Sequence, residues 1–216
     1  MGGTKSGLLG TQPAGRSFHF DDDEGVLGNG ETRGPTGIDE PVPLGTGRII
    51  AKVTNDWTPP NPTKTPEIIV RGATLAAVGN ELMQLGEWGQ AGGSLRADPI
   101  EAGSTTDLTV NLRGNLLYRL PTWTRYANAS AAVKAEWDKM FRALTAHEDR
   151  HLAIAIEEGD ALAKALTGKD IAEIARRVTA ANARMKQRQD KLDHDTQNGS
   201  RDGVQYGNVT LDVSIT

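Results

Sequence analysis

The longest helical pattern in the chain covers residues 131–166, which read AAVKAEWDKMFRALTAHEDRHLAIAIEEGDALAKAL. Ser130 precedes it as a good helix cap, and Gly168 follows it as a good stop. Within the pattern, the spacings of three and four residues that define one helical face are occupied by Leu144, His147, His151, Ile154 and Glu158. We therefore expect a long helix over about 131–166 whose histidines point toward the interior.

Inside this helix, His147-Glu148-Asp149-Arg150-His151 has the pattern H-E-x-x-H. Histidines four residues apart lie one turn from each other on the same face, so both imidazoles can reach one Zn²⁺ at about 2.0–2.1 Å. In such motifs the glutamate takes a proton from the metal-bound water instead of binding the metal. The pattern predicts metal-assisted hydrolysis, most often of a peptide bond. Asp149 and Arg150 are expected at the surface.

The competing interpretation is a chance match, with the two histidines solvated or hydrogen-bonded to ordinary side chains. However, two of the four histidines in the chain fall in this pattern, on a face expected to be buried. Buried imidazoles need partners, and a metal ion supplies one. We therefore favour a zinc site at His147 and His151.

The composition limits the other functions. A chain of 216 residues is long enough for one substantial domain. Its net charge of −4 gives no basic excess, so nucleic acid is not expected as a partner. The absence of cysteine excludes disulfides and thiolate ligands, so zinc must use His, Asp or Glu. Because no stretch approaches about 18 consecutive apolar residues, no membrane span is predicted.

Residues 1–64 differ in composition from the rest, since they hold seven of the ten prolines and the acidic run 21–24. Such a segment buries little by itself. One interpretation is a flexible extension; the other is an extended arm that docks on a partner protein or covers the active-site cleft. A short strand is expected at 48–53. Residues 1–20 lack the apolar core of a secretory signal, so we expect a protein that is cytoplasmic or exported by a non-classical route.

The residues from 65 to 216 predict one α+β domain, in which a small antiparallel sheet packs on long helices. A strand is expected at 67–70, and a helix from Thr74 that ends near the glycines at 89, 92 and 93. Residues 107–112 and 115–120 predict a β-hairpin closed by Arg113-Gly114. A second long helix is expected from Asp170 to about Lys191, and a strand or hairpin over 204–215.

A catalytic zinc ion needs three protein ligands and an open position, so a third ligand is required. Glu158 is seven residues beyond His151 and so about 10 Å further along the helix, which is too far. The polar turn expected at 193–199 concentrates candidate ligands just after an antiparallel helix, where they would return beside the motif. Asp193 and His194 are the two candidates.

Several short motifs surround this site: Gly72-Ala73-Thr74, Pro121-Thr122-Trp123, Trp137, His147 to His151, and Asp193 to Gly199. Over residues 65–206 they resemble the bacterial predicted secreted zinc-dependent proteases grouped as domain of unknown function 922. The resemblance implies a zincin-like zinc metallopeptidase that acts on a peptide or protein substrate, in a family whose members are mostly secreted. It matches Asp193 to the family's aspartate, whereas the family's histidine falls on Asn198.

We expect Glu148 to act as the general base. Tyr206 lies just past the ligand turn, so we expect it to help polarise the scissile carbonyl. Trp123 and Trp137 are expected in the core. Two other functions stay open. One is a zincin-fold protein that has lost turnover and binds a partner through its arm. The other is a leaderless effector or cargo enzyme of a bacterial secretion or injection system.

Overall fold

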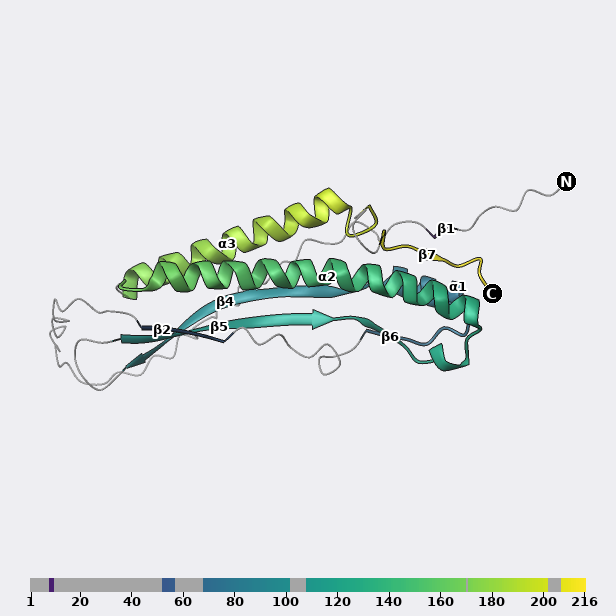
Figure 1. Cartoon of the computed structure of the whole chain (residues 1–216), viewed down its shortest axis with the longest axis horizontal. Coiled ribbons are helices and arrows are strands. Elements are labelled where there is room, and N and C mark those ends of the chain that lie inside the picture. The colour runs from purple at the N-terminus through teal and green to yellow at the C-terminus, as the bar shows by residue number, and fades with distance from the viewer. Residues whose placement is uncertain (1–7, 10–51, 57–67, 102–107, 170, 202–206) are drawn as a thin grey trace, which may run out of the picture.

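The computed structural model describes residues 8–9, 52–56, 68–101, 108–169, 171–201 and 207–216. Two long helices, α2 (Ala131–Leu166) and α3 (Ile171–Thr196), lie on one side of a three-stranded sheet (Figure 1). The other elements are β1 (Leu8–Leu9), β2 (Lys52–Asp56), β3 (Ile68–Val70), α1 (Leu75–Leu85), β4 (Gln90–Glu101), β5 (Leu108–Arg119), β6 (Pro121–Trp123), a short 3-10 helix (Tyr126–Asn128) and β7 (Leu211–Asp212). The predicted α+β class is confirmed.

Helix α2 has the predicted bounds. The side chain of Ser130 accepts a hydrogen bond from the Val133 N–H, and the left-handed Gly168 (φ 76°) follows the helix at its end. The predicted inner face is buried at Leu144, His147 and Glu158. Local capping and periodicity therefore determine the element that carries the motif.

The main sheet has the strand order β2-β5-β4, with β4 antiparallel and β2 parallel to β5. The predicted hairpin at Arg113-Gly114 is wrong, because β5 is one continuous strand in which Gly114 faces Leu95 of β4. The glycines expected to end the first helix lie in or beside β4 instead. A Cβ at Gly93 (φ 154°) would be 2.5 Å from the Asn115 carbonyl oxygen, so the close approach of the two strands requires glycine there.

Two described segments belong to the proline-rich region. Strand β2 pairs with β5, and β1 pairs with β7 near the C-terminus. The strand expected at 48–53 overlaps β2 at Lys52 and Val53, while 48–51 lie outside the described residues. The region before residue 65 thus contributes a strand to the main sheet.

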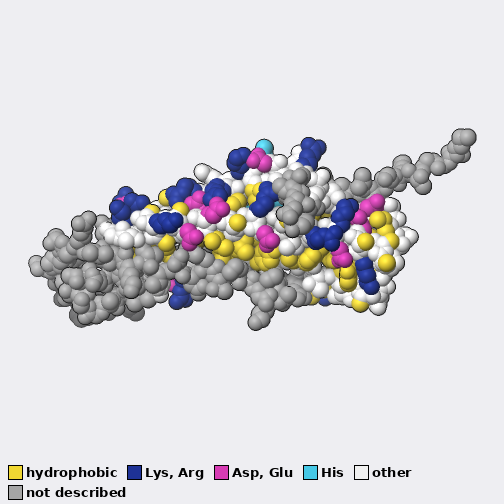
Figure 2. Space-filling model, in the orientation of Figure 1, with side chains coloured by type: hydrophobic (Ala, Val, Ile, Leu, Met, Phe, Trp, Pro, Cys, Tyr) yellow, Lys and Arg dark blue, Asp and Glu magenta, His cyan; other side chains and the backbone are white. Residues whose placement is uncertain are grey.

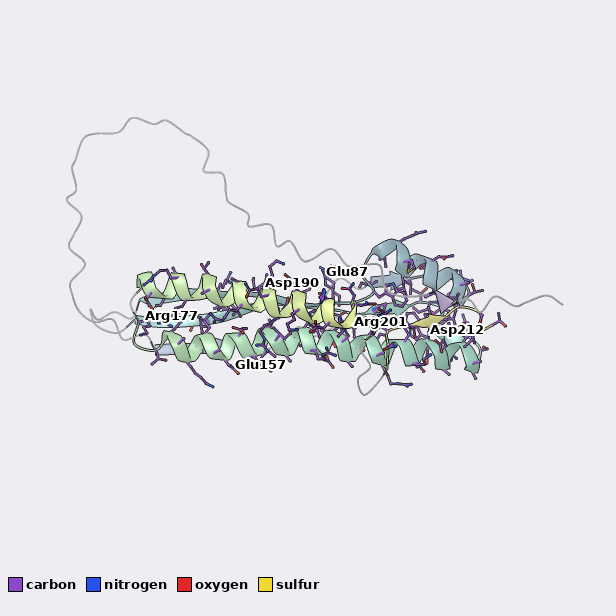
Figure 3. All side chains as sticks on the ribbon, turned by 90° about the horizontal axis from the view of Figure 1, so that it is seen from above. Glu87, Glu157, Arg177, Asp190, Arg201 and Asp212 are labelled. Carbon is purple, nitrogen blue, oxygen red and sulfur yellow. The ribbon has the colours of Figure 1, made fainter. Side chains whose placement is uncertain are left out.

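Helix α3 covers the outer edge of β4. The side-chain amide of Asn182 accepts a hydrogen bond from the Leu95 N–H at 2.8 Å and donates one to the Leu95 carbonyl at 2.9 Å. On α2, about two turns beyond His151, the buried carboxylate of Glu158 binds Arg184 and Arg188 of α3. Seen from above, the two helices run side by side (Figure 3). These contacts set the position of the C-terminal turn of α3 relative to α2.

Trp123 and Trp137 are buried in the core, as predicted, with ring centroids 5.5 Å apart. They belong to a hydrophobic cluster formed by β3, α1, β6, β7 and the N-terminal half of α2. A second cluster fills the space between the main sheet and the two long helices. On the face shown in Figure 2, basic and acidic side chains are interspersed over the helices. Among the described residues, no helix combines the length and the apolar content that crossing a membrane requires.

Candidate metal centre

The two motif histidines are buried and face each other. His147 and His151 are 2% and 4% exposed, and their Nε2 atoms are 3.2 Å apart. Both residues use the same ring nitrogen toward the same point, as expected for imidazoles one turn apart on the inner face of α2. The Nδ1 atom of His151 is buried and has no hydrogen-bond partner among the described residues.

Asp193 brings a third candidate ligand atom to this point. Its Oδ1 atom lies 2.9 Å from His151 Nε2 and 3.3 Å from His147 Nε2. It belongs to the last turn of α3, so the prediction that this helix ends near Lys191 and that Asp193 lies in a polar turn is wrong. The helix continues to Thr196 and ends at three left-handed residues, Gln197 (φ 49°), Asn198 (φ 53°) and Gly199 (φ 80°).

The spacing of the three atoms fits a single tetrahedral ion. Bonds of about 2.0–2.1 Å at tetrahedral angles place neighbouring ligand atoms about 3.3 Å apart. The observed separations are 2.9, 3.2 and 3.3 Å. The group consists of two imidazoles and one carboxylate, which is a common donor set for catalytic zinc, and it leaves one coordination position for a water or substrate.

The charge on Asp193 suits a ligand. Burial alone would raise the pKa of Asp193, but hydrogen bonds from His147 and His151 outweigh it and lower the pKa to about 2. The carboxylate is therefore ionised at neutral pH, as a metal ligand must be.

Glu148 lies beside these ligands and is only 4% exposed. The backbone N–H of Ala91, in β4, lies close enough to the Glu148 carboxylate to favour its charged form. A Cβ on Gly89 would be 2.7 Å from Glu148 Oε1, so the residue just before β4 packs directly on the carboxylate. Burial, followed by the negative charges of Asp193 and Glu87, raises the pKa of Glu148 well above its ordinary value. A carboxylate with a raised pKa is a stronger base, which suits proton transfer.

A family model described as a bacterial protein of unknown function (DUF922) matches residues 69–200, which is more than half of the chain. The chain belongs to the DUF922 family. The matched region begins in β3 and ends just after α3, so it contains His147, Glu148, His151 and Asp193. Searches of curated proteins and of solved structures gave no significant match.

In this DUF922 chain, the other candidates do not join the three ligand atoms. The side chain of His194 is 89% exposed, and its Nδ1 atom lies 3.4 Å from Asp195. Glu158, already excluded by its distance, is paired with Arg184 and Arg188. Tyr206 lies outside the described residues.

Asn198, which stands where the resemblance expects a histidine, helps to end α3. Its N–H donates to the Asp193 carbonyl at 2.8 Å, and its left-handed backbone turns the chain toward Gly199. Gly199 packs on the site, because a Cβ there would lie 3.2 Å from His147 Cγ. The turn after α3 therefore closes one side of the histidine pair.

The sequence analysis did not anticipate the contribution of residues 87–91, which lead into β4 and form its start. Glu87 is half-buried, and burial together with the charge of Asp193 raises its pKa. Figure 3 shows it beside the C-terminal part of α3. No motif marks this segment, because Ala91 acts through its backbone and Gly89 through the absence of a side chain. The glycines at 89, 92 and 93 were the available signal, and they predicted a helix end instead.

Proposed function

We propose that this DUF922 protein is a zinc-dependent metallopeptidase of the zincin-like kind, acting on a peptide or protein substrate. The observation that carries the proposal is the convergence of His147 Nε2, His151 Nε2 and Asp193 Oδ1 beside a buried glutamate. Two histidines and a carboxylate also hold ferrous iron in oxygenases. Glu148 favours hydrolysis, because an oxygenase site has no need of a buried proton acceptor next to its ligands.

In the proposed reaction, Glu148 transfers the proton that hydrolysis requires. A bound Zn²⁺ would polarise the scissile carbonyl and make water acidic enough to give up a proton near neutral pH. Glu148 accepts the proton from the attacking water and delivers it to the leaving amine, which makes it general base and then general acid. Its raised pKa supports the first step, because a carboxylate with a raised pKa is a stronger proton acceptor.

The geometry of the site depends on the packing of two long helices against each other. Helix α2 carries both histidines and Glu148, whereas α3 supplies Asp193. The bonds from Glu158 to the arginines of α3, and from Asn182 to β4, keep the last turn of α3 in place. The third ligand is therefore held by tertiary packing and not by a loop.

The test measures zinc binding and cleavage together. The metal-free protein is titrated with Zn²⁺ and then incubated with casein and with a mixed peptide library, whose products are read by mass spectrometry. We expect one zinc per chain and new peptide termini. Glu148→Gln should bind zinc equally well and cleave at least about 100-fold more slowly, in line with the usual contribution of a general base. Glu81→Gln, at a glutamate of α1 whose side chain accepts a hydrogen bond from the Arg71 N–H, is the control and should behave as wild type.

A second candidate is a zincin-fold protein that binds metal without turnover. Asn198 favours it, because the histidine that the resemblance expects there is absent and the asparagine is engaged in ending α3. Stoichiometric zinc binding with no cleavage of any substrate, and no effect of Glu148→Gln, would support this candidate over the peptidase. Absence of zinc binding would exclude both.

A further inference from the structure

Tyr118 of β5 makes a short hydrogen bond to the residue that follows Glu148. Its hydroxyl donates to Asp149 Oδ1 at 2.6 Å, and the tyrosine itself is 6% exposed. Burial, together with the hydrogen bond and the charge of Asp149, raises the pKa of Tyr118, so the hydroxyl keeps its proton and remains a donor. Asp149 is exposed, as the sequence predicted, but one of its oxygens is engaged with the sheet.

The partner of Tyr118 in the sheet is Ala91, whose N–H lies near the Glu148 carboxylate. The two residues face each other in the β4–β5 pairing. One position in the sheet therefore contacts two consecutive residues of the motif: Tyr118 bonds to Asp149 through its hydroxyl, and the chain that leads into Ala91 packs on the Glu148 carboxylate at Gly89. Consecutive residues of an α-helix project about 100° apart. Contacts with both resist rotation of α2 about its axis, which a single contact would allow.

We infer that Tyr118, acting through Asp149, is a positioning residue that fixes the rotation of α2 at the motif and so keeps the Glu148 carboxylate beside the three ligand atoms. This inference rests on the proposed function for its kinetic consequence. Neither Tyr118 nor Asp149 needs to touch substrate. The sheet sets the direction in which the proton acceptor points, while α3 sets the third ligand.

The chain offers a matched control. Tyr126 donates a hydrogen bond of the same kind to Asp138 Oδ2 at 2.9 Å, also between partly buried groups and also to a residue of α2. Asp138 is ten residues before Glu148 and so about 15 Å away along the helix. Tyr126→Phe therefore removes an equivalent tyrosine–aspartate bond without touching the rotation of the helix at the motif.

The kinetic experiment compares these variants in the full-length zinc-loaded protein. Tyr118→Phe and Asp149→Ala should each lower kcat by about 10- to 100-fold, the effect of a misplacement of about 1 Å, while KM and zinc stoichiometry stay unchanged. The double variant should be no slower than either single one, because both remove the same bond. Asp149→Asn keeps an acceptor oxygen and should recover most of the rate. Tyr126→Phe should keep the wild-type kcat.

A second measurement does not depend on turnover. The amide proton of Ala91 lies near the Glu148 carboxylate, so its hydrogen exchange and chemical shift report the position of that carboxylate. Both can be followed by NMR in the protein with and without zinc. Tyr118→Phe should speed exchange at Ala91 and move its resonance, whereas Tyr126→Phe should not. An unchanged Ala91 amide in Tyr118→Phe overturns the inference, as does an unchanged kcat in an active protein. If wild type cleaves nothing, the proposed function fails, and the Ala91 amide still decides the inference.

Discussion

Replacing Asp193 or its neighbour His194 by alanine separates the two candidate third ligands. They are adjacent in the last turn of α3 but face different ways: Asp193 Oδ1 is 2.9 and 3.3 Å from the two histidine nitrogens, whereas the His194 side chain is 89% exposed. Asp193→Ala removes one of three donors from a site whose spacing suits a tetrahedral ion. His194→Ala removes only a surface side chain.

The size of the effect follows from mass action. At a free zinc concentration of about 100 times the Kd, binding stabilises the native state by about 2.7 kcal/mol. In a protein of this size each kcal/mol moves the Tm by about 2–4 °C, so zinc should raise the wild-type Tm by about 5–11 °C. Loss of groups that only orient ligands weakens metal binding by about 10- to 100-fold, so loss of a direct ligand should weaken it by at least about 100-fold. The zinc stabilisation of Asp193→Ala then falls to about 0.4 kcal/mol or less.

Thermal unfolding in EDTA and at one fixed free zinc concentration measures both shifts, with the wild-type Kd taken from calorimetry. The EDTA baseline of each variant removes the effect of the substitution on the metal-free fold. His194→Ala should keep the full zinc shift, and Asp193→Ala should lose nearly all of it. A wild-type zinc shift in Asp193→Ala, or its loss in His194→Ala, would refute the assignment of the ligand set.

Three further predictions follow from the surroundings of the site. The folded-state pKa of Glu148 is raised, so its charge destabilises the fold by an amount that is zero below about pH 4 and grows as the pH rises. Glu148→Gln should therefore stabilise the zinc-free protein at neutral pH but not in acid. Urea unfolding at both pH values measures this, and equal effects at the two would contradict it. Gly89→Ala places a methyl group 2.7 Å from Glu148 Oε1, so it should lower kcat while zinc stoichiometry holds; an unchanged rate would show that the carboxylate can move freely. Asn182→Ala removes both bonds to Leu95 and should cost about 2 kcal/mol, which lowers the Tm by about 4–8 °C in thermal unfolding; no change would mean that water replaces the amide.

Helix α2 and its motif could be predicted closely because the determining signals are local. A serine cap, a glycine stop and a regular apolar spacing all lie within the helix or next to it. Asp193 became one of the two candidate ligands because of its residue type and its resemblance to a family position, while its setting in a helix was missed. Three left-handed residues after Thr196 end α3, and a polar run of this kind cannot be distinguished by composition from a turn that starts earlier.

The sheet was predicted less well, because strand pairing is not local. Alternation over residues 108–119 is the same for one long strand and for two short ones, and Gly114 supplied a false turn signal. The partner strand β4 contains adjacent glycines, so it did not have the composition of a strand. The contacts of Glu148 with Ala91, and of Asp149 with Tyr118, follow from that pairing and could not be predicted without it.

The amide of Asn182 occupies both peptide groups of Leu95 at an edge where another polypeptide could otherwise add a strand. To open this edge, α3 must leave it, and α3 also carries Asp193. Any event that exposes the edge to self-association therefore also withdraws the acidic donor from the histidines. Zinc, by binding that donor, should protect the protein from aggregation as well as from unfolding.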